Sequence, residues 1–137
     1  MLASTVIATE LSGDPEDKLV PLQLGFDNFS IRALGWKAPK LLHYARSQNL
    51  NTVLFSDLDV YETLDSSYLN EIKKEAKNCD ITIQTGTGGI CPTSKKFKNN
   101  YGTATEHLNL IIRVAKDVGS TVAVSYTHLT LPTNVAV

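Results

Sequence analysis

The sequence predicts an α/β fold in which strands and helices alternate along the chain, and three observations lead to this prediction. Short runs of strand character recur about every 30 to 40 residues. Amphipathic segments with helix-capping residues lie between them. The composition, 42% hydrophobic with a net charge of −1, is that of an ordinary globular domain. Such alternation indicates parallel strands joined by right-handed crossovers.

The first two strands are predicted at residues 20–26 and 52–55, and the second is a short apolar run typical of a buried parallel strand. A helix between them has Pro39 in its first turn, where a missing N–H costs nothing. Its apolar stripe is Leu41, Leu42 and Ala45.

A second helix is predicted to begin at Ser66 or Ser67. Its apolar positions follow helical spacing and are Leu69, Ile72, Ala76 and Cys79. A third strand follows at residues 81–85, and a glycine-rich loop is expected over 86–102.

The third helix has the clearest signals in the chain. Thr103 and Glu106 have the spacing of a capping box, and Gly119 stands where a left-handed C-cap belongs. The predicted buried stripe is Leu108, Ile111, Ile112, Ala115 and Val118. A fourth strand is expected to begin at residues 121–123.

Two architectures fit this order, a doubly wound open sheet and a closed barrel. A (β/α)8 barrel has about 250 residues in eight units, and here four units occupy about 120 residues. Thr82 and Gln84 share one face of the third strand. They could point into a barrel, whereas in an open sheet a buried Gln84 would need a partner. We therefore expect residues 20–123 to be the N-terminal half of a truncated (β/α)8 TIM barrel, preceded by a flexible lead-in at 1–19.

The end of the chain does not follow this pattern. Residues 124–133 agree with one reading frame of a common transposase sequencing adapter over ten consecutive positions. A native strand and loop is the rival interpretation, but a helix should follow a fourth strand here. We therefore expect residues 124–137 to be a non-native tail, and His128 is not considered a metal ligand.

Composition limits the function classes. The charge balance lacks the basic footprint of nucleic-acid binding, and no apolar run is long enough to span a membrane. The N-terminus lacks the basic segment of a secretory signal. Cys79 and Cys91 do not make a disulfide framework, and Cys79 is expected to be a reduced core thiol. A cytoplasmic protein is predicted.

Functional residues of parallel α/β proteins lie on loops that follow the strands. Three such clusters follow the first three predicted strands. The candidate substrate-binding residues in them are Asp27, Asn28, Arg32, Trp36, Asp57, Asp59, Tyr61, Thr87, Gly88 and Cys91. Carboxylates accept hydrogen bonds from sugar hydroxyls, but two acids without a histidine are a weak metal signal. The alternatives are that Asp27 and Asn28 cap a turn and that Asp57 and Asp59 lead into a helix.

Other candidates have weaker support. The glycines at 86–89 could cradle a phosphate or form a mobile substrate loop, but they match no phosphate-binding fingerprint. Lys95, Lys96 and Lys98 are expected to form a solvated basic face. Cys91 could be a nucleophile, but no paired base is identified. Both His43 and His107 are expected at the surface of their helices.

Three stretches, residues 24–38, 54–62 and 86–94, resemble bacterial sugar-phosphate isomerases/epimerases with the xylose-isomerase-like barrel. The resemblance covers residues 22–123. It implies a parent enzyme that uses a divalent metal (Mn, Mg, Zn or Co) and moves a proton next to a sugar carbonyl. The family's metal ligands lie on later strands, so no metal ligand and no catalytic residue is assigned here.

The resemblance thus implies binding of a sugar or sugar phosphate, with no metal expected in this chain and no activity of its own. A half barrel exposes strand edges, so self-association is also expected. Two alternatives stay open: a metal-dependent endonuclease on the same barrel, which the lack of a basic surface disfavours, and a non-catalytic sugar-binding α/β domain.

Overall fold

The computed structural model describes residues 22–126, and these form one parallel sheet with helices packed on it. The strand order is β1-β2-β3-β4, the same as the order along the chain. The strands are β1 (Gly25–Asp27), β2 (Thr52–Phe55), β3 (Thr82–Gly88) and β4 (Ala123–Tyr126). Pairing places Phe26 beside Val53 and Val53 beside Ile83, so these residues share a face.

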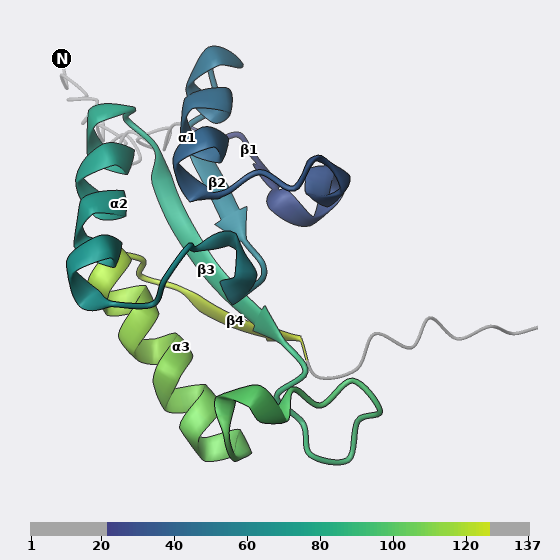
Figure 1. The fold of residues 1–137 in the computed structure, drawn as a ribbon. Coiled ribbons are helices and arrows are strands. Elements are labelled where there is room, and N and C mark those ends of the chain that lie inside the picture. The colour runs from purple at the N-terminus through teal and green to yellow at the C-terminus, as the bar shows by residue number, and fades with distance from the viewer. Residues whose placement is uncertain (1–21, 127–137) are drawn as a thin grey trace, which may run out of the picture.

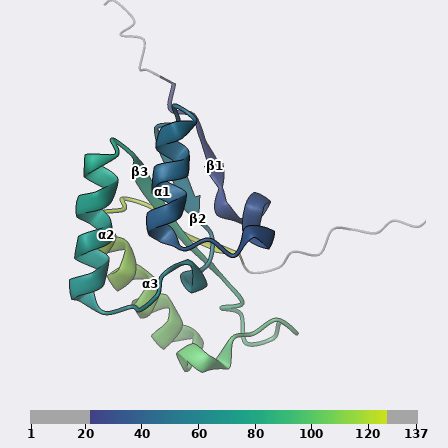
Figure 2. The same cartoon turned by 45° about the horizontal axis from the view of Figure 1, so that its top comes forward.

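The three α-helices lie on the same side of this sheet (Figures 1 and 2). They are α1 (Ala38–Ser47), α2 (Ser66–Asn78) and α3 (Ala104–Val118), with short 3₁₀ turns η1 (Asn28–Leu34), η2 (Leu58–Val60) and η3 (Asn99–Tyr101). Right-handed crossovers that always step in one direction place every helix on one face. A doubly wound sheet has helices on both faces, so the described residues do not form one.

The core lies between the helices and one face of the sheet. Val53 and Phe55 of β2 are fully buried there, and Ile83 of β3 is 3% exposed. On the opposite face Thr82 is exposed and Gln84 is half-buried. The prediction that Thr82 and Gln84 share one face of their strand is therefore confirmed, and it is the face that the described helices leave uncovered.

The helix ends follow the predicted local signals. Thr103 and Glu106 form the reciprocal capping box at the start of α3. Gly119 ends that helix with φ +76°, the left-handed conformation that glycine adopts without strain. Pro39 lies in the first turn of α1, and Cys79 is a buried free thiol.

Two predicted boundaries and one predicted burial pattern are wrong. β1 begins at Gly25, and the earlier predicted strand positions 20 and 21 lie outside the described residues. β3 continues to Gly88, because residues 86–88 pair with β4 instead of starting a loop. In α3 the predicted core residues Leu108 and Ile112 are 45% and 40% exposed.

The buried stripe of α3 is rotated relative to the prediction. It consists of His107, Ile111, Val114, Ala115 and Val118. Spacings of three and four residues fit either stripe, and the flank that holds Leu108 and Ile112 is the exposed one.

β4 continues without a break across residue 124, where the non-native tail is expected to begin. Residues 1–19 and 127–137 lie outside the described residues. Among the residues that are described, no helix combines the length and the apolar character needed to cross a membrane.

Candidate functional site

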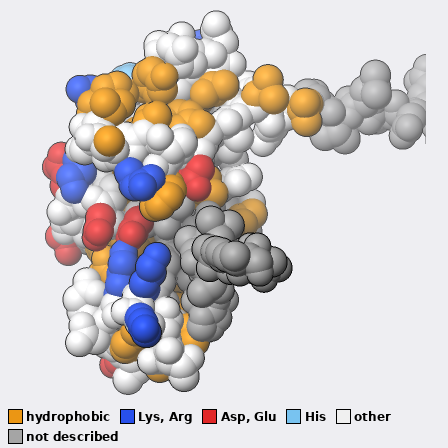
Figure 3. Space-filling view, turned by 90° about the vertical axis from the view of Figure 1, so that its right-hand side faces the viewer, with side chains coloured by type: hydrophobic (Ala, Val, Ile, Leu, Met, Phe, Trp, Pro, Cys, Tyr) orange, Lys and Arg blue, Asp and Glu red, His pale blue; other side chains and the backbone are white. Residues whose placement is uncertain are grey.

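A pocket of about 280 Å³ lies beyond the carboxyl ends of β1 and β2, and it brings together half of the ten predicted site residues. These five are Asn28, Arg32, Trp36, Asp57 and Asp59. They come from the loops after two neighbouring strands, whose carboxyl ends meet at one edge of the sheet. The face that carries these loops shows acidic and basic side chains close together (Figure 3).

Asn28 fixes one wall of this pocket. Its Oδ1 accepts hydrogen bonds from the backbone N–H and the hydroxyl of Ser56, at 2.8 and 3.2 Å. The loop after β1 is thereby joined to the end of β2. Asp27 does not line the pocket, because its Oδ1 accepts from the backbone N–H of Phe29 at 2.9 Å and caps η1. The turn-capping alternative is therefore correct for Asp27.

Arg32 and Trp36 supply the planar groups of the pocket. The Arg32 guanidinium lies 3.8 Å from the centroid of the Phe29 ring and donates to the Phe29 carbonyl at 2.9 Å. Arg32 is exposed as a residue, and its guanidinium carries further N–H donors for a ligand. Trp36 packs edge-on against Tyr44, and the Lys40 ammonium lies 4.4 Å from the Trp36 ring centroid.

Asp57 and Asp59 are each held by the loop between β3 and α3. Lys98 Nζ contacts Asp57 Oδ2 at 2.5 Å, and the Tyr101 hydroxyl donates to Asp59 Oδ1 at 3.2 Å. Burial, together with the charges of Asp59 and Asp57, raises the pKa of Tyr101 to about 12. Tyr101 therefore stays a hydrogen-bond donor across the physiological pH range.

The expected solvated lysine face is confirmed for Lys95 and Lys96, which are exposed, but it is wrong for Lys98. Lys98 reaches back to the end of β2 because its carboxylate partner Asp57 lies there. Lys98 and Tyr101 do not line the pocket but contact two residues that do. These contacts could not be predicted from sequence, since both residues belong to a loop with no pattern that predicts where it folds.

Four of the predicted site residues point elsewhere. Tyr61 is 4% exposed and packs edge-on against Phe55 in the core, where burial raises the pKa of its hydroxyl. Thr87 is fully buried and faces α3. Gly88 lies at the end of β3. Cys91 contacts Thr93, with Sγ 3.1 Å from Oγ1, and this contact lowers the pKa of the Cys91 thiol.

The placement of Gly86, Thr87 and Gly88 also removes most of the predicted phosphate cradle. All three pair with β4 in the sheet, so they are not part of an open loop. A side chain at Gly86 would approach the Ser56 Cα at 3.3 Å, which accounts for glycine at this position of a packed strand.

His107 is fully buried, so the prediction of a surface histidine is wrong. Its Nε2 lies 2.9 Å from the Thr87 hydroxyl, and its ring is 4.6 Å from the Tyr101 ring. Burial lowers the pKa of His107, and the positive charge of Lys98 lowers it further. Within residues 22–126 its Nδ1 has no hydrogen-bond partner. The sequence signal that could have predicted the burial of His107 is its i, i+4 spacing from Ile111, which places both residues on the same face of α3.

His43 is exposed as predicted, with its Nε2 2.8 Å from Glu75 Oε1. It belongs to the outer surface of α1 and α2 and lies apart from the pocket residues.

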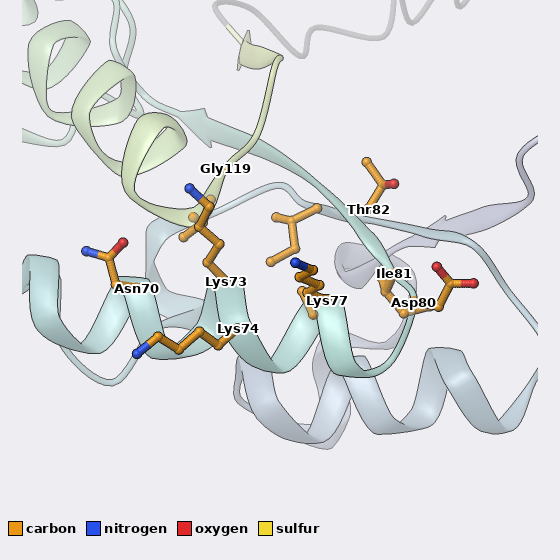
Figure 4. Close-up of a pocket in the computed structure, with 11 residues that line it drawn as sticks. Asn70, Lys73, Lys74, Lys77, Asp80, Ile81, Thr82 and Gly119 are labelled. Atoms are coloured by element: carbon orange, nitrogen blue, oxygen red, sulfur yellow. The ribbon is translucent and has the colours of Figure 1, made fainter.

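A second and larger pocket, of about 560 Å³, lies at the opposite end of the sheet (Figure 4). Lys73, Lys74 and Lys77 of α2 lie around it, and the start of β3 and Gly119 are also part of its lining. The carboxyl ends of α2 and α3 lie here, and helix carboxyl ends favour cations and disfavour anions. The lysines therefore complement the helix dipoles, and the smaller pocket is the better ligand site.

No protein-family model, curated protein or solved structure matches the chain. The residues that the structure describes contain no group of three or more His, Cys, Asp or Glu side chains placed to hold a metal ion. The divalent metal implied by the resemblance was expected on later strands, so this finding does not test it, and no chemical step through a metal is derived.

Proposed function

We propose that the pocket after β1 and β2 binds a sugar or sugar phosphate, as the substrate-facing wall of a barrel-type isomerase or epimerase. The observation that carries this proposal is the convergence of Asp57, Asp59, Asn28 and Arg32 around one pocket beside Trp36. Acceptors and donors side by side suit a ligand with several hydroxyls, and an aromatic ring suits its apolar C–H face. Arg32 supplies donors for a phosphate group.

The barrel architecture is part of this proposal. Four parallel strands in sequential order, with every described helix on one face, are what a segment of a (β/α)8 wall would have. The uncovered face would then line the barrel interior. The parent enzyme's metal and proton-transfer groups would come from elsewhere, and these residues alone would bind ligand without turnover. A non-catalytic sugar-binding domain would share the binding step and lack the isomerase step.

Intrinsic fluorescence tests the binding step, because Trp36 is the single tryptophan of the chain and lines the pocket. We expect saturable fluorescence changes on titration with fructose or fructose 6-phosphate. Asp59→Asn should weaken binding of both at least about 10-fold, since it removes a charged hydrogen-bond acceptor. Arg32→Gln should weaken only the phosphorylated sugar.

Asp80→Asn is the matched control for the carboxylate substitution. Asp80 is exposed, borders the other pocket and has φ +57°, which asparagine tolerates. Equal effects of Asp59→Asn and Asp80→Asn, or no saturable change with either sugar, would refute the proposal.

A further inference from the structure

Lys98 is held in place at both its backbone and its ammonium group. Its backbone N–H donates to the Gly89 carbonyl at 2.8 Å, which closes the neck of the loop 89–98. Gly89 has φ +72°, and a Cβ there would lie 2.3 Å from the Lys96 carbonyl oxygen. Only glycine fits this neck, so the loop geometry fixes where the Lys98 side chain begins. Its Nζ then meets Asp57.

The two carboxylates of the pocket, Asp57 and Asp59, differ in the charge of their side-chain partners. Asp59 Oδ1 accepts from the neutral Tyr101 hydroxyl, whereas Asp57 Oδ2 meets the Lys98 charge at 2.5 Å. Asp57 Oδ1 is buried and has no hydrogen-bond partner among the described residues. Without Lys98, two carboxylates with an unused oxygen would line one pocket, and such oxygens are the ligands that Ca²⁺ prefers.

Two cations, Lys37 and Arg32, line this pocket. Lys37 Nζ donates to the backbone carbonyl of Asp59 at 2.7 Å, and Arg32 rests on Phe29. Neither has an ion pair with Asp57 or Asp59 within residues 22–126. Lys98 is therefore the one cation among the described residues that directly occupies a pocket carboxylate.

We propose that Lys98 is a specificity-determining residue of this pocket: a tethered cation that keeps divalent ions away from Asp57 and Asp59. Lys98 does not line the pocket itself and acts through Asp57, whose negative charge it neutralises, so the pocket is left to hydroxyl-bearing ligands. This inference rests on the proposed function, because it takes the pocket to be the sugar site.

The test is calcium chloride titration of the full chain, followed by calorimetry and Trp36 fluorescence. Lys98→Met should bind Ca²⁺ at least 10-fold more tightly than the wild type, with Kd on the order of 1 mM, the range of weak oxygen-ligand sites. Lys98→Arg keeps the charge and should bind no more tightly than the wild type. Lys95→Met, an exposed lysine of the same loop, is the matched control.

A gain in Lys98→Met that disappears when Asp57→Asn is added supports the inference. Equal calcium binding by Lys98→Met, Lys95→Met and the wild type overturns it. Circular dichroism checks folding, and Lys98→Gln takes the place of the methionine variant if that variant unfolds. The sugar titrations of the wild type test the proposed function separately. Absence of sugar binding would refute the proposed function, whereas an unchanged calcium affinity of Lys98→Met would refute only the role of Lys98.

Discussion

The two faces of the sheet differ in what covers them and in how they treat polar side chains. On the helix-covered face, Val53 and Phe55 are fully buried, and the polar Thr87 at the end of that face bonds to His107. On the other face, Thr82 is exposed and Gln84 is half-buried. Polar groups on the covered face are cut off from water, and Thr85 Oγ1 there has no hydrogen-bond partner among the described residues. Polar groups on the uncovered face can bind water.

The residues that stabilise the fold and the residues proposed to bind a ligand lie in different parts of the molecule. The covered face holds the one core of the described residues, and the helices α1, α2 and α3 all contribute to it. The candidate pocket lies beyond the strand ends, on loops tied down by Asn28, Lys98 and Tyr101. Substitutions in the core should therefore change unfolding first, and substitutions in these loops should change ligand binding first.

The largest expected effect is that of Phe55→Ala. Phe55 is fully buried and packs against Tyr61, with ring centroids 5.7 Å apart. Its removal leaves a cavity in the core and should lower the free energy of unfolding by about 3–5 kcal/mol. The measurement is urea unfolding followed by circular dichroism. Leu54→Ala, the neighbouring position on the uncovered face, is the control, and an equal loss there would contradict the difference between the faces.

An intermediate effect is expected for His107→Gln, which replaces the imidazole packed between Thr87 and Tyr101 by a flexible amide and should cost about 1–3 kcal/mol at pH 8. Burial lowers the pKa of His107 in the folded protein. The unfolded chain therefore takes up the proton first, below about pH 6.5. The stability that neutral His107 contributes is complete above that pH and is lost as the pH falls below it.

The pH dependence is measured by urea unfolding at pH 8 and pH 5. The wild type should lose more stability between these values than His107→Gln, because the variant lacks the titrating ring. Identical losses in both proteins would mean that the ring is accessible to protons in the folded state, contrary to its burial.

Local signals predicted the elements of this fold well. The capping box at Thr103, the C-cap at Gly119 and the limits of β2 are as the sequence predicts. Each depends on neighbours within a few residues, so no knowledge of the tertiary structure is needed. β3 was predicted too short because Gly86 and Gly88 are poor strand formers, and only the pairing with β4 keeps them in the sheet.

The site was predictable in part for a related reason. Residues directly after β1 and β2 reach the pocket because the strand ends place them there, as with Asn28 and Asp57. Lys98 and Tyr101 lie far along the chain, 41 and 42 residues from their acidic partners, and only the folded loop brings them together. His107 was misassigned because a polar residue on a helix is usually exposed.

The smallest expected effect is that of Gln84→Ala, at the centre of the uncovered face. Gln84 is half-buried and makes no side-chain hydrogen bond with the described residues, so the change in the free energy of unfolding should stay within about 0.5 kcal/mol.

Repeating the urea unfolding experiment at 2 protein concentrations about 20-fold apart tests whether a second copy of the chain covers this face. A face in contact with water gives the same small effect at both concentrations. A larger effect at the higher concentration would mean that a second copy covers this face, which is the self-association expected of a half barrel, and sedimentation velocity of the wild type would then show a dimer at that concentration.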